Sequence, residues 1–167
     1  MILLGLGTNL GDRVQNLQQA IDALAASMKV TAVSPIYETP PWGVTDQPSF
    51  YNICLAVETD KTPKQLLSFI KNLEIELGRE PTYRWGPRLI DIDLLFFGSR
   101  VIDEDALQVP HPRMQDRAFV LAPLAAIASE FVHPQTGQSV QAMLAMTDQR
   151  GIRPLTDVSL RTPTQCG

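Results

Sequence analysis

The spacing of apolar residues divides the first hundred positions into strands and helices. Apolar or β-branched runs predict four strands, within residues 1–6, 30–39, 50–59 and 89–98. Between them, apolar residues at helical spacing predict one helix with Asp12 as its N-cap and a second that begins at Pro63, directly after Thr62. Gly78 stands where the second helix is expected to end.

This order of elements, β-α-β-β-α-β, is typical of ferredoxin-like α+β domains, in which an antiparallel sheet carries both helices on one face. Residues 117–128 and 139–148 predict two further short C-terminal helices. The chain has no apolar periodicity after about residue 147. We therefore expect a single domain over residues 1–147 and a loosely structured C-terminal tail over residues 148–167.

The composition is that of an ordinary globular protein, with 44% hydrophobic and 19% charged residues among 167. A net charge of −4 and a pI of about 5.1 argue against a non-specific nucleic-acid binder. The start of the chain lacks the features of a signal peptide, and no apolar run reaches the roughly 20 residues of a membrane span. Cys54 and Cys166 make neither a disulfide framework nor a zinc motif. We expect a cytoplasmic protein that binds neither nucleic acid nor membrane.

Two acidic residues, Asp91 and Asp93, interrupt the apolar fourth strand within the stretch RWGPRLIDIDLLFFG, residues 84–98. Residues two apart point to the same face of a strand, and their backbones lie about 6.6 Å apart at a rise of about 3.3 Å per residue. Such a pair is suited to bind one hard cation such as Mg²⁺, or to bridge two. The alternative is a pair of solvated acids on a half-exposed strand.

Three arginines, Arg79, Arg84 and Arg88, precede the acid pair within ten positions. Arginine is suited to bidentate contacts with phosphate, so the acids and arginines together favour a site for a nucleotide polyphosphate. Pairing of the arginines with the two acids is the alternative, and it accounts for one or two of the three. The sequence contains neither a P-loop motif nor the protein-kinase motifs.

Glycines and prolines mark the connections between the predicted elements. Gly5, Gly7 and Gly11 are expected to let the chain turn tightly between the first strand and the first helix. Residues 38–49 and 79–88 form two long proline-rich segments. Long connections without their own secondary structure often carry function.

Two further positions are candidates for substrate contacts. Phe50 and Asn52 share one face of the third strand, where a ring beside an amide suits a flat heterocycle; ordinary strand residues are the alternative. His111 is a candidate phosphate contact, with a structural role as the alternative. Because His133 is the only other histidine, a multi-histidine metal centre is excluded.

Several blocks of the sequence resemble the 6-hydroxymethyl-7,8-dihydropterin pyrophosphokinase family of folate biosynthesis. The blocks, in chain order, are LGTNLGDR, YETPPWG, DQPSFYN, RWGPRLIDIDLLFFG and VPHPRMQDRAFVLAPL. The resemblance covers about residues 2–145. It implies transfer of a diphosphate from ATP to the hydroxymethyl group of the pterin, with release of AMP. ATP and hydroxymethyldihydropterin are then the partners, and we expect a monomer.

The resemblance also implies roles for individual residues. Asp91 and Asp93 would bind two Mg²⁺ ions that bridge the ATP phosphates, and Arg79 and Arg88 would be the catalytic, phosphate-holding arginines. The residues implied to contact the pterin are Thr39, Pro40, Trp42, Phe50, Asn52 and Phe119. Those implied to contact ATP are Glu74, Arg79, Arg84, Trp85, Arg88, His111 and Arg117.

Two other functions fit parts of the sequence. A nucleotide-sugar transferase with a DxD motif would use the acid pair, but 167 residues are few for it and its order of elements differs. A ferredoxin-like module that binds RNA or protein needs no aspartate pair beside three arginines, and the acidic pI counts against RNA.

Overall fold

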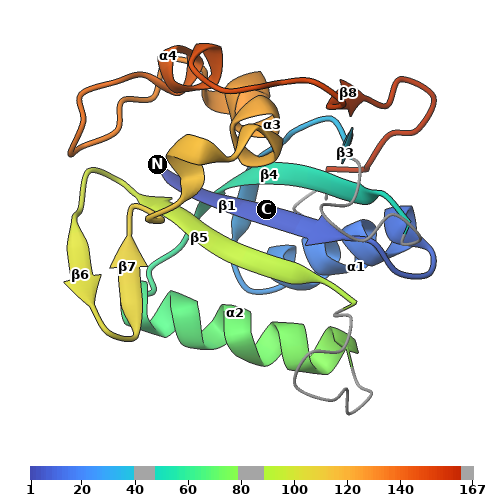
Figure 1. Ribbon diagram of the computed structural model, residues 1–167. Coiled ribbons are helices and arrows are strands. Elements are labelled where there is room, and N and C mark those ends of the chain that lie inside the picture. Colours follow the sequence, from blue (N-terminus) through green and yellow to red (C-terminus); the bar gives the residue numbers. More distant parts are fainter. Residues whose placement is uncertain (40–47, 79–88, 163–167) are drawn as a thin grey trace.

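The computed structural model describes residues 1–39, 48–78 and 89–162 (Figure 1). Its strands are β1 (Ile2–Thr8), β2 (Lys29–Val33), β3 (Tyr37–Thr39), β4 (Phe50–Glu58), β5 (Asp91–Phe97), β6 (Ile102–Glu104), β7 (Leu107–Val109) and β8 (Arg153–Pro154). Its helices are α1 (Arg13–Ala25), α2 (Pro63–Gly78), α3 (Ala118–Ala128) and α4 (Val140–Ala145), with a 3-10 turn at Met114–Asp116.

One antiparallel sheet forms the centre of the molecule. Strands β5, β1, β4, β3 and β8 lie side by side in that order, and β2 also pairs with β4. Helices α1 and α2 cover one face of this sheet, while α3 and α4 lie over the other (Figure 1). The predicted ferredoxin-like α+β fold with extra C-terminal helices is therefore confirmed, and those extra helices enclose the second face of the sheet.

The second predicted strand is interrupted in its middle. Strands β2 and β3 both pair with β4, but the three residues between them stand opposite only Ile53 and Cys54. Pro35 has no N–H group to donate to a neighbouring strand. Ser34 instead holds this segment against β4. Its Oγ accepts a hydrogen bond from the backbone N of Cys54, and its own N donates to the Cys54 carbonyl, both at 2.9 Å.

The predicted starts of both long helices are confirmed by their caps. The carboxylate of Asp12 accepts a hydrogen bond from Gln15 N at 3.1 Å. Thr62 and Gln65 form a reciprocal capping box, with Oγ1 accepting from Gln65 N at 3.2 Å and Thr62 N donating to Oε1 of Gln65 at 2.9 Å. Among the described helices, none has the length and apolar character needed to cross a membrane.

Alternation along the central strands sends side chains into two separate cores. The core beneath α1 and α2 includes Leu4, Leu6, Leu17, Ile21, Leu55, Ile70, Ile92 and Leu94. The core beneath α3 and α4 includes Leu3, Ala56, Phe96, Leu121, Leu124 and Val140. Because Ile92 and Leu94 face the first core, Asp91 and Asp93 lie on the opposite sheet face, which α3 covers.

The chain after residue 147 makes more contacts than the loose tail that we expected. Strand β8 pairs with β3, and Leu155 N donates to the carbonyl of Ile36 at 2.8 Å. Leu155, Val158 and Leu160 are partly buried against the core beneath α1 and α2. A strand of two residues is too short to produce a hydrophobic period, so the sequence pattern does not reveal it.

Candidate active site

A cavity of about 470 Å³ lies on the sheet face that α3 covers. Strands β1, β3, β4 and β5 form its floor and the start of α3 lies above it. It brings together these predicted site residues: Thr39, Phe50, Asn52, Asp91, Asp93, Arg117 and Phe119. These seven residues come from β3, β4, β5 and the start of α3, so segments far apart in the sequence meet in one cavity.

The amide of Asn52 is buried in the cavity floor, between Thr39 of β3 and Gly7 of β1. Its Nδ2 donates a hydrogen bond to Oγ1 of Thr39 on the adjacent strand, at 3.1 Å. On the other side, Gly7 of β1 is its register partner, and a Cβ placed on Gly7 would lie 2.7 Å from the amide oxygen. A side chain at Gly7 is therefore incompatible with this position of the amide. The result is a fixed polar edge in the cavity floor.

Gly5 and Gly7 lie inside β1, and the prediction that they belong to the following turn is wrong. Only Gly11 of the three takes a turn conformation, with φ of +59°. Because strand residues two apart share a face, both strand glycines open onto the cavity. Glycine alternating with leucine over residues 4–7 is the sequence signal for this role, since glycine within a strand often marks a close approach.

Asp91 and Asp93 lie half-buried on the cavity wall at the start of β5. Among the described residues, no group of three or more His, Cys, Asp or Glu side chains is placed to hold a metal ion. Two carboxylates fit Mg²⁺, which usually binds one or two protein carboxylates and completes its shell with water and substrate phosphates. They do not fit a structural zinc ion, which takes four protein ligands.

Two side chains from other elements hold the beginning of β5. Glu74 of α2 accepts a hydrogen bond through Oε2 from Ile92 N, the backbone group between the two acids, at 2.9 Å. Thr8, at the end of β1, donates from Oγ1 to the carbonyl of Leu89 at 2.6 Å. Glu74 therefore contacts the backbone of the strand that carries the acid pair, but it is not among the residues that line the cavity.

His111 and Arg117 lie near the acid pair. His111 N donates to the carbonyl of Leu95 on β5, at 3.0 Å. Burial lowers the pKa of the His111 imidazole, the charge of Asp93 raises it, and Arg117 is among the cations that lower it further. The imidazole is therefore neutral at pH 7. The Arg117 guanidinium lies 5.7 Å from the centre of the Phe119 ring, so a cation and an aromatic wall adjoin in the cavity.

Cys54 also lines the cavity, which the sequence did not indicate. Its side chain is fully buried, and its Sγ lies 3.5 Å from the carbonyl oxygen of Val120 as a weak donor. Burial raises the pKa of the thiol. The thiolate is the nucleophilic form of cysteine, so this neutral thiol is not suited to covalent catalysis.

The remaining predicted site residues lie outside the described residues: Pro40, Trp42, Arg79, Arg84, Trp85 and Arg88. Their neighbours in sequence are described on both sides. Thr39, which directly precedes residues 40–47, and Asp91, three positions after residues 79–88, both line the cavity. Their proposed roles rest on the sequence.

Fold and cavity together define an α+β domain with an acid pair beside a polar and aromatic pocket. Residues 3–129 match the family model described as 7,8-dihydro-6-hydroxymethylpterin-pyrophosphokinase (HPPK). The chain is 44% identical over 151 residues to the 2-amino-4-hydroxy-6-hydroxymethyldihydropteridine pyrophosphokinase of Methylorubrum extorquens, covering 89% of this chain and 94% of that protein. It is 44% identical over 152 residues to the Bacillus subtilis protein of the same name, covering 90% and 87%. The chain belongs to the HPPK family.

A solved structure shows the same fold. The crystal structure of wild-type Plasmodium falciparum HPPK-DHPS with pteroate has a TM-score of 0.70 and 19% sequence identity, and the match covers 86% of this chain. This chain spans 41% of that longer chain. At this identity the likeness concerns the fold, and the family membership rests on the sequence matches.

Proposed function

We infer that this chain transfers a diphosphate group from ATP to the hydroxymethyl group of 6-hydroxymethyl-7,8-dihydropterin, releasing AMP, in folate biosynthesis. The observation that carries this conclusion is one cavity that contains both the acid pair and the buried Asn52 amide. Acids suit metal-bound phosphates, and an amide beside aromatic rings suits a flat polar heterocycle. One cavity with both lets the phosphates and the acceptor alcohol meet in a productive orientation. Family membership and the names of the relatives support the same reaction.

At the pterin end, Asn52 hydrogen-bonds the polar edge of the heterocycle. Phe50 from β4 and Phe119 from the start of α3 both line the cavity, and we assign them to the two faces of the ring. Thr39 orients the Asn52 amide through its hydrogen bond. The sequence adds Pro40 and Trp42 to this proposed set.

At the phosphate end, Asp91 and Asp93 would hold two Mg²⁺ ions on the ATP phosphates. Bound Mg²⁺ would neutralise phosphate charge and polarise the β-phosphorus. Arg117 supplies a cation on the cavity wall, and His111 supplies a neutral imidazole beside it. The other residues proposed for ATP are Glu74, Arg79, Arg84, Trp85 and Arg88. Among them, Arg79 and Arg88 are proposed to stabilise the charge that develops on the AMP leaving group.

The chemical step needs positioning and charge stabilisation rather than covalent catalysis. The hydroxymethyl oxygen forms a bond to the β-phosphorus, and the bond from that phosphorus to the bridging oxygen of AMP breaks. The alcohol proton passes to water, and the electron pair of the broken bond stays with AMP. The neutral Cys54 thiol takes no part in this step. We further propose a cytoplasmic, monomeric enzyme, in which a single chain supplies both ends of the cavity.

We expect Asn52→Ala to weaken binding of 6-hydroxymethyl-7,8-dihydropterin by about 10- to 100-fold, because a buried polar edge of the ligand is left unpaired. Binding of a non-hydrolysable ATP analogue with Mg²⁺ should change little, since the acid pair lies on another strand. Calorimetry with each ligand separately tests this. Equal losses for both ligands would mean that Asn52 has a structural role and would remove the pterin assignment.

A further inference from the structure

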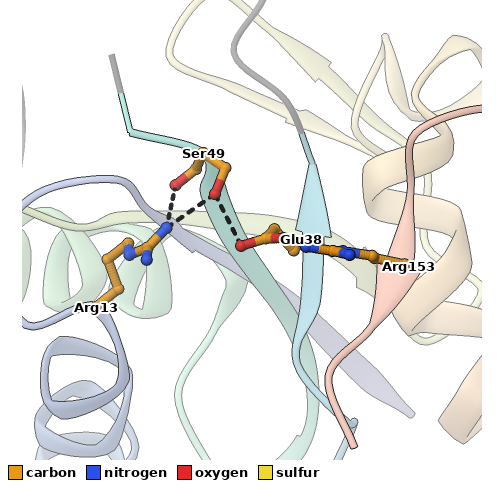
Figure 2. Close-up of polar contacts among 4 residues, drawn as sticks. All are labelled: Arg13, Glu38, Ser49 and Arg153. Atoms are coloured by element: carbon orange, nitrogen blue, oxygen red, sulfur yellow. Dashed lines mark hydrogen bonds and ion pairs between the residues drawn. The ribbon is translucent and has the colours of Figure 1, made fainter. Parts of the chain in front are cut away.

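Four residues from distant parts of the chain form a hydrogen-bonded network, which we call the Glu38 clamp: Arg13, Glu38, Ser49 and Arg153 (Figure 2). Arg13 donates from Nη1 to the carbonyl and the Oγ of Ser49, both at 2.9 Å. Ser49 donates to Oε2 of Glu38 at 3.0 Å. Arg153 donates from Nε and Nη2 to Oε1 of Glu38, at 3.0 and 2.6 Å. The clamp therefore joins α1, β3, the residue before β4, and β8.

Two members of the clamp adjoin residues of the cavity. Glu38 directly precedes Thr39, and Ser49 directly precedes Phe50. Thr39 and Phe50 are also register partners in the β3–β4 ladder. Because neighbouring residues in a strand point to opposite faces, the clamp lies on the face away from the cavity. From that face, it holds together the two backbone segments that carry Thr39 and Phe50.

The charges of the clamp explain why Glu38 needs these hydrogen-bond partners. The Glu38 side chain is only 18% exposed, whereas the Arg153 side chain is 73% exposed. Hydrogen bonds from Arg153 lower the pKa of Glu38, burial opposes this, and Ser49 and Arg13 lower it further. Glu38 is therefore ionised at neutral pH, and a largely covered carboxylate is stable only with such partners.

We propose that Arg153 is a positioning residue for the pterin pocket. Through Glu38 it fixes β3 against the start of β4, and so it fixes Thr39, the hydrogen-bond partner of Asn52. The proposal rests on the proposed function and extends it to the C-terminal segment. Arg153 lies beyond residues 3–129 that match the family model, so the family match assigns it no role.

We expect Arg153→Ala to raise the dissociation constant for 6-hydroxymethyl-7,8-dihydropterin by about 2- to 5-fold, the size set by one exposed ion pair. The dissociation constant for the ATP analogue with Mg²⁺ should not change. Amide hydrogen exchange should become faster at residues 37–39 and 50–52, because the strand pair opens more readily. Calorimetry and exchange on the full-length chain measure both effects.

Arg150→Ala is the matched control. Arg150 lies in the same C-terminal segment and pairs with Asp148 at 2.7 Å, with a side chain that is 91% exposed. Arg150→Ala removes the same positive charge as Arg153→Ala, but Arg150 pairs with Asp148 rather than with Glu38 of β3. The affinity for the pterin should therefore stay at the wild-type value. In a Glu38→Gln background, Arg153→Ala should produce no further loss, because the charged partner is already absent.

Equal pterin affinities for wild type and Arg153→Ala would overturn the proposal, as would an equal loss of affinity for the ATP analogue. A loss of the same size in Arg150→Ala would assign the effect to net charge and would also overturn it. If the wild-type chain binds no pterin, the proposed function fails. The exchange rates at residues 37–39 then decide separately whether Arg153 positions β3.

Discussion

Asp91→Asn and Asp93→Asn are each expected to lower the turnover number by at least about 100-fold, since loss even of an outer-shell partner of a metal ligand costs about 10- to 100-fold. The two carboxylates lie on one face of β5 at the cavity wall, so each substitution removes a ligand charge from the proposed Mg²⁺ site. The fold should be retained, because relief of carboxylate repulsion offsets any lost contact. Steady-state kinetics over a range of Mg²⁺ concentrations and thermal unfolding measure the two expectations.

Asp105→Asn is the control for these variants. Asp105 lies exposed between β6 and β7, away from the cavity. The substitution removes the same charge as Asp91→Asn, so the turnover number of this variant should equal that of the wild type. Normal activity of Asp91→Asn or Asp93→Asn at limiting Mg²⁺ would contradict the metal assignment. A large fall in unfolding temperature would assign the loss to folding instead.

Gly7→Ala is expected to weaken pterin binding by about 10- to 100-fold, nearly as much as Asn52→Ala. A methyl group at position 7 would lie 2.7 Å from Oδ1 of Asn52, so the amide must leave the position in which it contacts Thr39. The variant should bind the ATP analogue with Mg²⁺ normally. Calorimetry with each ligand measures both affinities.

The double variant Gly7→Ala/Asn52→Ala separates this explanation from a general effect on β1. With the amide removed, Gly7→Ala should cost less than about 3-fold in pterin affinity, because the clashing group is gone. Gly5→Ala offers a comparison on the same strand face: its Cβ would meet the flexible end of Leu95 at 3.3 Å, so a smaller loss is expected. A full loss from Gly7→Ala in the Asn52→Ala background would show that the methyl group disturbs the strand itself.

The long elements of the fold were predictable because each repeats an apolar face many times and begins with a recognisable cap. Asp12 and Thr62 are such caps. The contact between β8 and β3 was not predictable, because Arg153 and Glu38 are 115 positions apart and a strand of two residues has no period. Only the folded chain places them together.

The candidate site was predictable where a local motif carries the chemistry, as in the acid pair of β5 and the ring and amide of β4. The role of Gly7 was not, because it depends on the register that sets this glycine opposite Asn52. A shift of one residue would place Leu6 or Thr8 opposite Asn52 and send every side chain of β1 to the other face. Spacing within one strand carries no information about its partner.

The nucleotide product of one turnover tests the central claim most directly. Full-length protein is incubated with ATP, Mg²⁺ and 6-hydroxymethyl-7,8-dihydropterin, and the nucleotides and pterins are separated and quantified. We expect AMP and the pterin diphosphate in equal amounts, with neither formed when the pterin is omitted. Formation of ADP, or of AMP at the same rate without the pterin, would contradict diphosphate transfer to the pterin alcohol.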